Sequence, residues 1–163
     1  MRRESGFTYL MALFAVAIMG AGLALTGQVW HTGARREKEA ELLFVGNQYR
    51  KAIERYYLAG PGQYPRMLED LIKDPRQPAT VRHLRRLYPD PVGDSAKWGL
   101  INAPQGGILG IHSLSDAKPL KNAGFGPLDT AFERATTYAD WKFVFVPGQA
   151  GAATPAKPVA QQR

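Results

Sequence analysis

The sequence contains no cysteine and few of the patterns that catalysis requires. Without cysteine, the chain has no disulfide bonds and no thiolate ligands for a metal ion. The histidines, His31, His83 and His112, are far apart in the sequence, and none has the spacing of a zinc site. A glycine-rich phosphate loop and a nucleophile elbow are also missing, and Ser113 beside His112 has no identifiable acid to orient it. These absences predict a protein that is not an enzyme.

Charge is missing from one long stretch, residues 7–29, which is almost entirely apolar. At about 1.5 Å per residue, this stretch makes a helix of about 35 Å, compared with about 30 Å for the hydrocarbon core of a bilayer. A secretory signal peptide has a shorter apolar core, followed by a cleavage site of small residues. We therefore expect residues 7–29 to form a transmembrane helix. Basic residues precede and follow this stretch, so the charges alone do not fix its orientation.

The helical pattern continues after the apolar stretch, but only one face of it is apolar. The first clear stop is the tripeptide Gly60-Pro61-Gly62, so we expect residues 30–59 to form an amphipathic stalk helix. Its apolar residues recur every three or four positions and predict one buried stripe. They are Leu42, Val45, Tyr49, Ala52, Ile53 and Tyr56.

Residues 60–147 are enough for one small head domain with a single core. Three segments, residues 98–101, 108–113 and 141–146, have the pattern of β-strands. The third is the strongest prediction, because alternation places Trp141, Phe143 and Phe145 on one face. The fold class is therefore α+β, with a long N-terminal α-helix packed on a small antiparallel β-sheet.

The rest of the head has weaker signals. Short helices are predicted over residues 64–75 and 81–87, and a helical turn over residues 128–134. Residues 115–127 are rich in Gly, Pro and Lys and predict a loop. Residues 148–163 are almost all Ala, Gly, Pro, Gln and Lys, which predicts a disordered tail.

The start of the chain joins a short basic segment to the apolar stretch. Residues 1–6 form a basic leader that ends in Gly6, and Phe7 opens the apolar helix. In this junction, and more loosely in residues 87–93 and 106–116, the chain resembles the type IV pilin superfamily, specifically the pseudopilins of type II secretion. The resemblance implies a pilin-like fold, cleavage after Gly6 by a prepilin peptidase, and methylation of the new amino terminus on Phe7.

The resemblance also implies partners and a location. The chain would pack its apolar helix against other pseudopilins, with the help of an inner-membrane assembly platform, in a homo- or hetero-oligomeric filament. It would cross the inner membrane once, with its amino terminus in the cytoplasm and residues 60–147 as a periplasmic head.

One position departs from the family pattern. Family members usually have a glutamate at the fifth residue of the mature chain, thought to pair with the amino terminus of a neighbour, and this sequence has Met11 there. The chain would therefore be either a minor subunit at a filament tip or a divergent member assembled by apolar packing alone. Gly20 and Gly22 cost the helix about 1 kcal/mol each relative to Ala, and they fit either local unwinding in a filament or close approach of membrane helices.

Three acidic residues suggest a cofactor. Major pseudopilins bind calcium with loop carboxylates and carbonyls, and Asp90, Asp94 and Asp116 stand in loops similar to that region. A calcium ion takes six to eight oxygen ligands, of which these residues would supply some. The sequences Asp90-Pro91 and Gly93-Asp94 are also typical of ordinary turns.

The chain is basic, with a net charge of +7, and part of the excess lies at Arg82, Arg85 and Arg86. These residues would either attract phosphate groups or form the solvated face of a short helix, and we favour the second interpretation. Two alternatives to a pseudopilin follow. One is a DNA-binding minor pilin of an uptake system, with these arginines as its phosphate path. The other is a plain signal-anchored periplasmic domain that no prepilin peptidase processes.

Overall fold

A computed structural model describes residues 5–148, without the side chains of residues 5–6 and 20–32. The chain divides into two compact units, Met1–Lys38 and Glu39–Arg163. Helix α1 (Ser5–Leu58) contributes residues to both units. Most of the predicted leader and all of the predicted tail after Gly148 lie outside the described residues.

The described part of the first unit is the beginning of α1, whose backbone is helical at Gly6, Gly20 and Gly22. No helix within the described residues is both long and apolar enough to cross a membrane. Residues 20–29 belong to the predicted membrane span, and their side chains lie outside the description. A span over residues 7–29 therefore stays a prediction.

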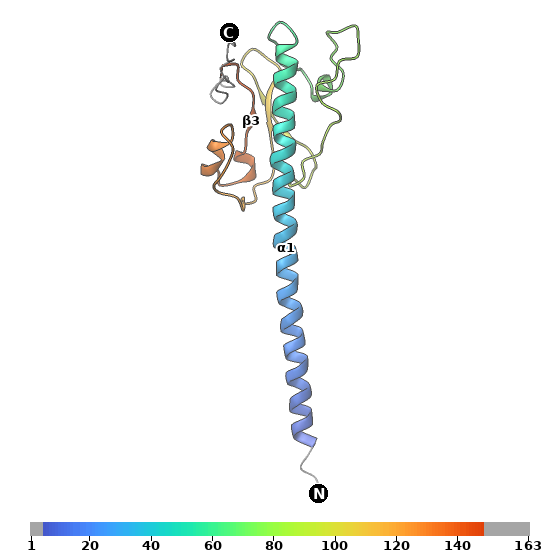
Figure 1. The fold of residues 1–163 in the computed structure, drawn as a ribbon, viewed down its shortest axis with the longest axis vertical. Helices are drawn as coiled ribbons and strands as arrows, with labels where there is room; N and C mark the ends of the chain where they lie inside the picture. Colours follow the sequence, from blue (N-terminus) through green and yellow to red (C-terminus); the bar gives the residue numbers. More distant parts are fainter. Residues whose placement is uncertain (1–4, 149–163) are drawn as a thin grey trace, which may run out of the picture. The chain divides into compact units, whose positions relative to one another are not determined.

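The second unit is built on a three-stranded antiparallel sheet with β2 in the middle. The strands are β1 (Gly99–Asn102), β2 (Ile108–His112) and β3 (Phe143–Val144). Gly99 pairs with His112 between β1 and β2, and Ile111 pairs with Phe143 between β2 and β3. The carboxyl-terminal part of α1 runs alongside this sheet, which confirms the predicted α+β class (Figure 1).

The contact between α1 and the sheet depends on a glycine. A Cβ atom built on Gly46 would overlap the ring of Phe143, so the absence of a side chain at this position lets helix and strand approach closely. The six apolar residues predicted to form the buried stripe of α1 are all buried. They join residues of the sheet and the loops in one core, among them Leu71, Leu84, Ile108, Ile111, Phe132, Tyr138, Trp141 and Phe143.

The predicted short helices are only partly correct. The segment 64–75 contains one 3₁₀ turn, η1 (Leu68–Leu71), and the predicted turn near residue 130 is the 3₁₀ helix η2 (Thr130–Arg134). The helix predicted over residues 81–87 is wrong. The carbonyl of Val81, which would accept from the Arg85 N–H in a helix, accepts instead from the Asp74 N–H at 3.1 Å. The backbone N–H groups of His83 and Leu84 both donate to the carbonyl of Leu71, at 2.8 Å each, and hold the segment in a non-helical conformation.

The strand predicted over residues 141–146 is much shorter than expected. The 3₁₀ helix η3 (Tyr138–Asp140) ends at Trp141, whose N–H still donates to the Tyr138 carbonyl at 3.1 Å. Trp141 therefore belongs to the end of η3, and the strand begins at Phe143. The predicted face is nevertheless confirmed, because Trp141, Phe143 and Phe145 are all buried.

Candidate functional site

Two surfaces are candidates for function: the apolar amino-terminal part of α1 and a basic groove in the second unit. The first is defined by nine large apolar residues between positions 7 and 19, with exposed fractions from 50% for Leu13 to 72% for Met19. Successive helical residues turn by about 100°, so these side chains point to every side of the helix. They are Phe7, Tyr9, Leu10, Met11, Leu13, Phe14, Val16, Ile18 and Met19.

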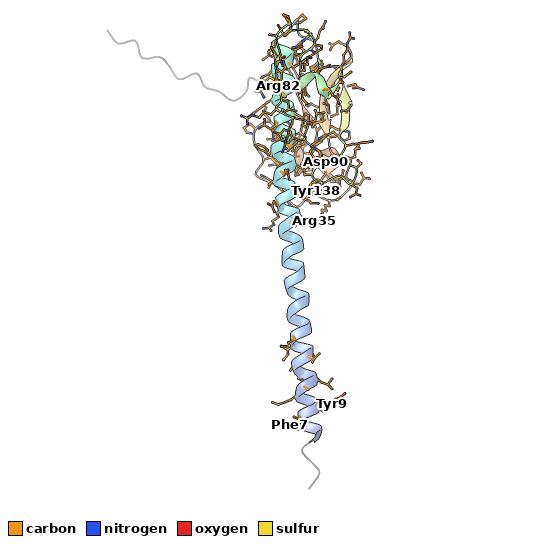
Figure 2. The ribbon with its side chains drawn as sticks, turned by 90° about the vertical axis from the view of Figure 1, so that its right-hand side faces the viewer. Phe7, Tyr9, Arg35, Arg82, Asp90 and Tyr138 are labelled. Carbon is orange, nitrogen blue, oxygen red and sulfur yellow. The ribbon has the colours of Figure 1, made fainter. Side chains whose placement is uncertain are left out.

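The side chains of Phe7 and Tyr9 point outward from the helix (Figure 2). Met11, at the position where the family usually has a glutamate, is 63% exposed. No charged residue lies between positions 7 and 19 to solvate this surface. The surface is therefore suited to contact with lipid or with other apolar helices. Gly6 has no described surroundings, and neither do Gly20 and Gly22, so their predicted roles in processing and assembly stay predictions.

The three arginines predicted as a possible phosphate site do not all line the same groove. Arg82, Arg85 and Arg86 are all exposed. Arg82 and Arg85 line a groove of about 800 Å³ together with Arg55 from α1. Arg86 does not line this groove, and its guanidinium carbon lies 4.9 Å from the centroid of the Tyr88 ring. The structure thus adds Arg55, which the sequence pattern did not single out.

Asp74, Arg76 and His83 form a buried charge network next to this groove, which the sequence pattern did not predict. The carboxylate of Asp74 accepts hydrogen bonds from Arg76 Nε at 2.9 Å and from its terminal nitrogen at 2.7 Å. Nε2 of His83 lies 3.2 Å from the same carboxylate. The Arg76 hydrogen bonds hold the pKa of the Asp74 carboxyl well below its usual range, although burial opposes this shift. The same contact raises the pKa of Arg76.

The acidic residues proposed for calcium lie in different environments. Asp90 is buried, where it accepts hydrogen bonds from Ser113 Oγ at 2.6 Å and from the Val92 N–H at 3.0 Å. Asp94 and Asp116 are exposed. Among the described residues, no group of three acidic or histidine side chains is placed to hold a metal ion. Calcium binding stays a prediction, which a calcium titration followed by melting temperature would test.

The sequence pattern also did not identify two other buried carboxylates, those of Glu39 and Asp129. Glu39 accepts hydrogen bonds from the N–H groups of Leu120 and Lys121, at 2.7 and 2.9 Å, and from the Tyr138 hydroxyl at 2.8 Å. Asp129 forms an ion pair with Arg50 at 2.8 Å. Both contacts join residues about eighty positions or more apart, and no short motif signals a pairing over such a separation.

Comparison of the chain with protein-family models, with characterised proteins and with solved structures finds no match.

Proposed function

We propose that this chain is a structural subunit of a pilin-like filament, of the kind found in type II secretion, which assembles through its apolar amino-terminal helix. The observation that carries the proposal is the exposure of apolar side chains on every side of α1 between positions 7 and 19. Burying one large apolar side chain stabilises an assembly by about 1.5–3 kcal/mol. Nine such side chains give a strong tendency to associate.

The organisation of the second unit supports this role. Its core is made from residue 42 onward, so the apolar residues 7–19 are not needed to complete it. A head with its own core can be carried by a helix whose surface is free for other contacts. Before assembly, that helix would cross the inner membrane with its amino terminus in the cytoplasm and the head in the periplasm.

The proposed cycle needs no chemistry from the chain itself. A prepilin peptidase would cleave after Gly6, and Phe7 would become the methylated amino terminus. The assembly platform would then move the apolar helix from lipid into contact with other pseudopilins. Met11 cannot neutralise a neighbouring amino terminus, so packing alone would hold this part of the helix.

The first test is the intact mass of the full chain, expressed with and without a prepilin peptidase. We expect loss of residues 1–6 and a gain of one methyl group only when the peptidase is present. The variant Gly6→Val should block this change, whereas Gly33→Ala, where a Cβ atom meets nothing within 4 Å, should be processed normally. An unchanged mass in the presence of an active peptidase would support a plain signal anchor instead.

A second test separates processing from assembly. Phe14→Glu places a charge on the exposed apolar surface, where an unpaired charge is costly in lipid or in a helix bundle. We expect the cleaved variant to be lost from sedimented filaments. Leu128→Glu changes an exposed apolar residue of the second unit in the same way and serves as the matched control. Equal sedimentation of the two variants would contradict assembly through the helix.

A further inference from the structure

The basic groove of the second unit lies between α1 on one side and residues 82–88, which follow η1 in the sequence, on the other. Phe44 and Arg55 come from α1, and Arg82, His83, Arg85 and Tyr88 come from the segment. Arg82 lies beside α1 in the head (Figure 2). The volume of about 800 Å³ is within the usual range for a binding site.

The segment that carries Arg82 and Arg85 is held firmly in place. His83 and Leu84, between the two arginines, both donate backbone hydrogen bonds to Leu71, and the His83 ring is buried beside Asp74. At the other end, the Tyr88 N–H donates to the Tyr49 hydroxyl at 2.9 Å. The groove is thus preformed, which lowers the entropy cost of binding a ligand.

The charge of the groove is positive and uncompensated. Within the part of the chain that the structure describes, Arg55, Arg82 and Arg85 form no ion pair with a carboxylate. The guanidinium group presents several N–H donors in a planar fork that matches the oxygens of a phosphate. Three such groups at one groove favour a ligand with more than one phosphate.

An aromatic surface adjoins these charges. Phe44 is 61% exposed on α1 and lines the same groove. An exposed aromatic ring beside arginines is the arrangement on which unpaired bases stack while their phosphates are neutralised. In a duplex the bases are stacked on one another inside the helix, where Phe44 cannot reach them. We infer that this groove binds single-stranded nucleic acid, with Arg55, Arg82 and Arg85 on the phosphates and Phe44 on a base.

The test uses the full chain in detergent and a fluorescent single-stranded DNA of about 12 nucleotides, a length that one small site can occupy. Fluorescence anisotropy at several salt concentrations gives the affinity and its salt slope. The double variant Arg82→Gln/Arg85→Gln should bind at least about tenfold more weakly at low salt, and its salt slope should fall by about 1.4, or about 0.7 for each lost phosphate contact. Phe44→Ala should weaken single-strand binding by about fivefold or more and leave the salt slope unchanged.

The double variant Lys97→Gln/Arg134→Gln removes the same charge from exposed positions outside the groove, and it should keep the salt slope of the unchanged chain. Unaltered melting temperatures would show that all variants fold. The inference is overturned if the two double variants lose the same affinity, if a duplex of the same length binds as tightly, or if Phe44→Ala has no effect. Binding to phosphatidylglycerol vesicles without binding to the oligonucleotide would also overturn it, in favour of a lipid surface. None of these outcomes depends on processing or filament assembly.

Discussion

The guanidinium group of Arg76 donates two hydrogen bonds to the carboxylate of Asp74, a contact that we call the clamp. The same group lies over the ring of Tyr56, with its guanidinium carbon 3.6 Å from the ring centroid. A terminal nitrogen of Arg76 also donates to the Tyr56 carbonyl at 2.7 Å. This one arginine therefore ties the last turns of α1 to the segment after η1. The same carboxylate contacts His83 and so fixes the wall of the basic groove.

Replacement of Asp74 should destabilise the second unit strongly. Asp74→Asn leaves Arg76 without its charge partner in a largely buried place, and breaking a buried ion pair from one side costs about 3–5 kcal/mol. Urea unfolding followed by tryptophan fluorescence would measure the loss. Asp94→Asn is the control, because Asp94 is exposed and its replacement should change the free energy of unfolding by less than about 0.5 kcal/mol. Similar values for the two variants would mean that the clamp contributes little.

The clamp also predicts a loss of stability in acid. Hydrogen bonds from Arg76 hold the pKa of Asp74 below its usual range in the folded chain, whereas the unfolded chain takes up this proton near pH 4. As the pH falls below about 4, the unfolded state binds the proton first, so the free energy of unfolding decreases by up to about 1.4 kcal/mol per pH unit. Above this range the contribution is fully present.

Asp140 should add to the same effect, since hydrogen bonds from Thr137 and Thr136 also lower its pKa. The contribution of Asp74 is isolated by comparing the unchanged chain with Asp74→Asn between pH 5 and pH 2. We expect the variant to have the shallower dependence of unfolding free energy on pH. Parallel curves would show that the pKa of Asp74 is the same in the folded and unfolded chains, which would contradict the prediction.

The sequence pattern predicted the parts of the fold that repeat at short range. The spacing of Leu42, Val45 and Tyr49 identified the buried face of α1, because a helix returns to the same side every three or four residues. The alternation of Trp141, Phe143 and Phe145 identified the buried face of the segment that contains β3, because successive residues of an extended chain point to opposite sides. Such patterns depend only on local geometry, so they can be recognised without the tertiary structure.

The secondary structure was predicted wrongly where residues distant in the sequence form hydrogen bonds with the backbone of the segment. Val81 and Leu84 have helical spacing, but the carbonyl of Val81, to which the Arg85 N–H would donate in a helix, accepts instead from the Asp74 N–H. At the candidate site, too, the sequence pattern identified only the residues that are close together in the sequence. Arg82 and Arg85 stood out as a local cluster, whereas Arg55, about thirty positions earlier, reaches their groove only through tertiary packing.

Gly46 provides a test of the helix–sheet contact. In an exposed helix, Gly→Ala stabilises by up to about 1 kcal/mol, but at Gly46 the added methyl group would overlap the buried ring of Phe143. Overpacking of a core costs about 1–3 kcal/mol, so we expect Gly46→Ala to lower the melting temperature. Gly126→Ala is the control, because its Cβ atom meets nothing within 4 Å. A melting temperature for Gly46→Ala at or above that of the control would mean that helix and strand can separate at little cost.

Glu39 should hold the loop that contains Leu120 and Lys121. The two N–H groups and the Tyr138 hydroxyl all donate to its carboxylate, which has acceptors for each of them. In Glu39→Gln one oxygen is replaced by an NH₂ group that cannot accept, so at least one of the three donors loses its partner. For a buried donor this loss costs about 1–3 kcal/mol. Hydrogen exchange at the Leu120 and Lys121 amides should then accelerate. Glu41→Gln, two positions further along α1 and exposed, should leave both amides protected. Because exchange is read at single amides, faster exchange throughout the second unit would instead indicate general unfolding and contradict a local role for Glu39.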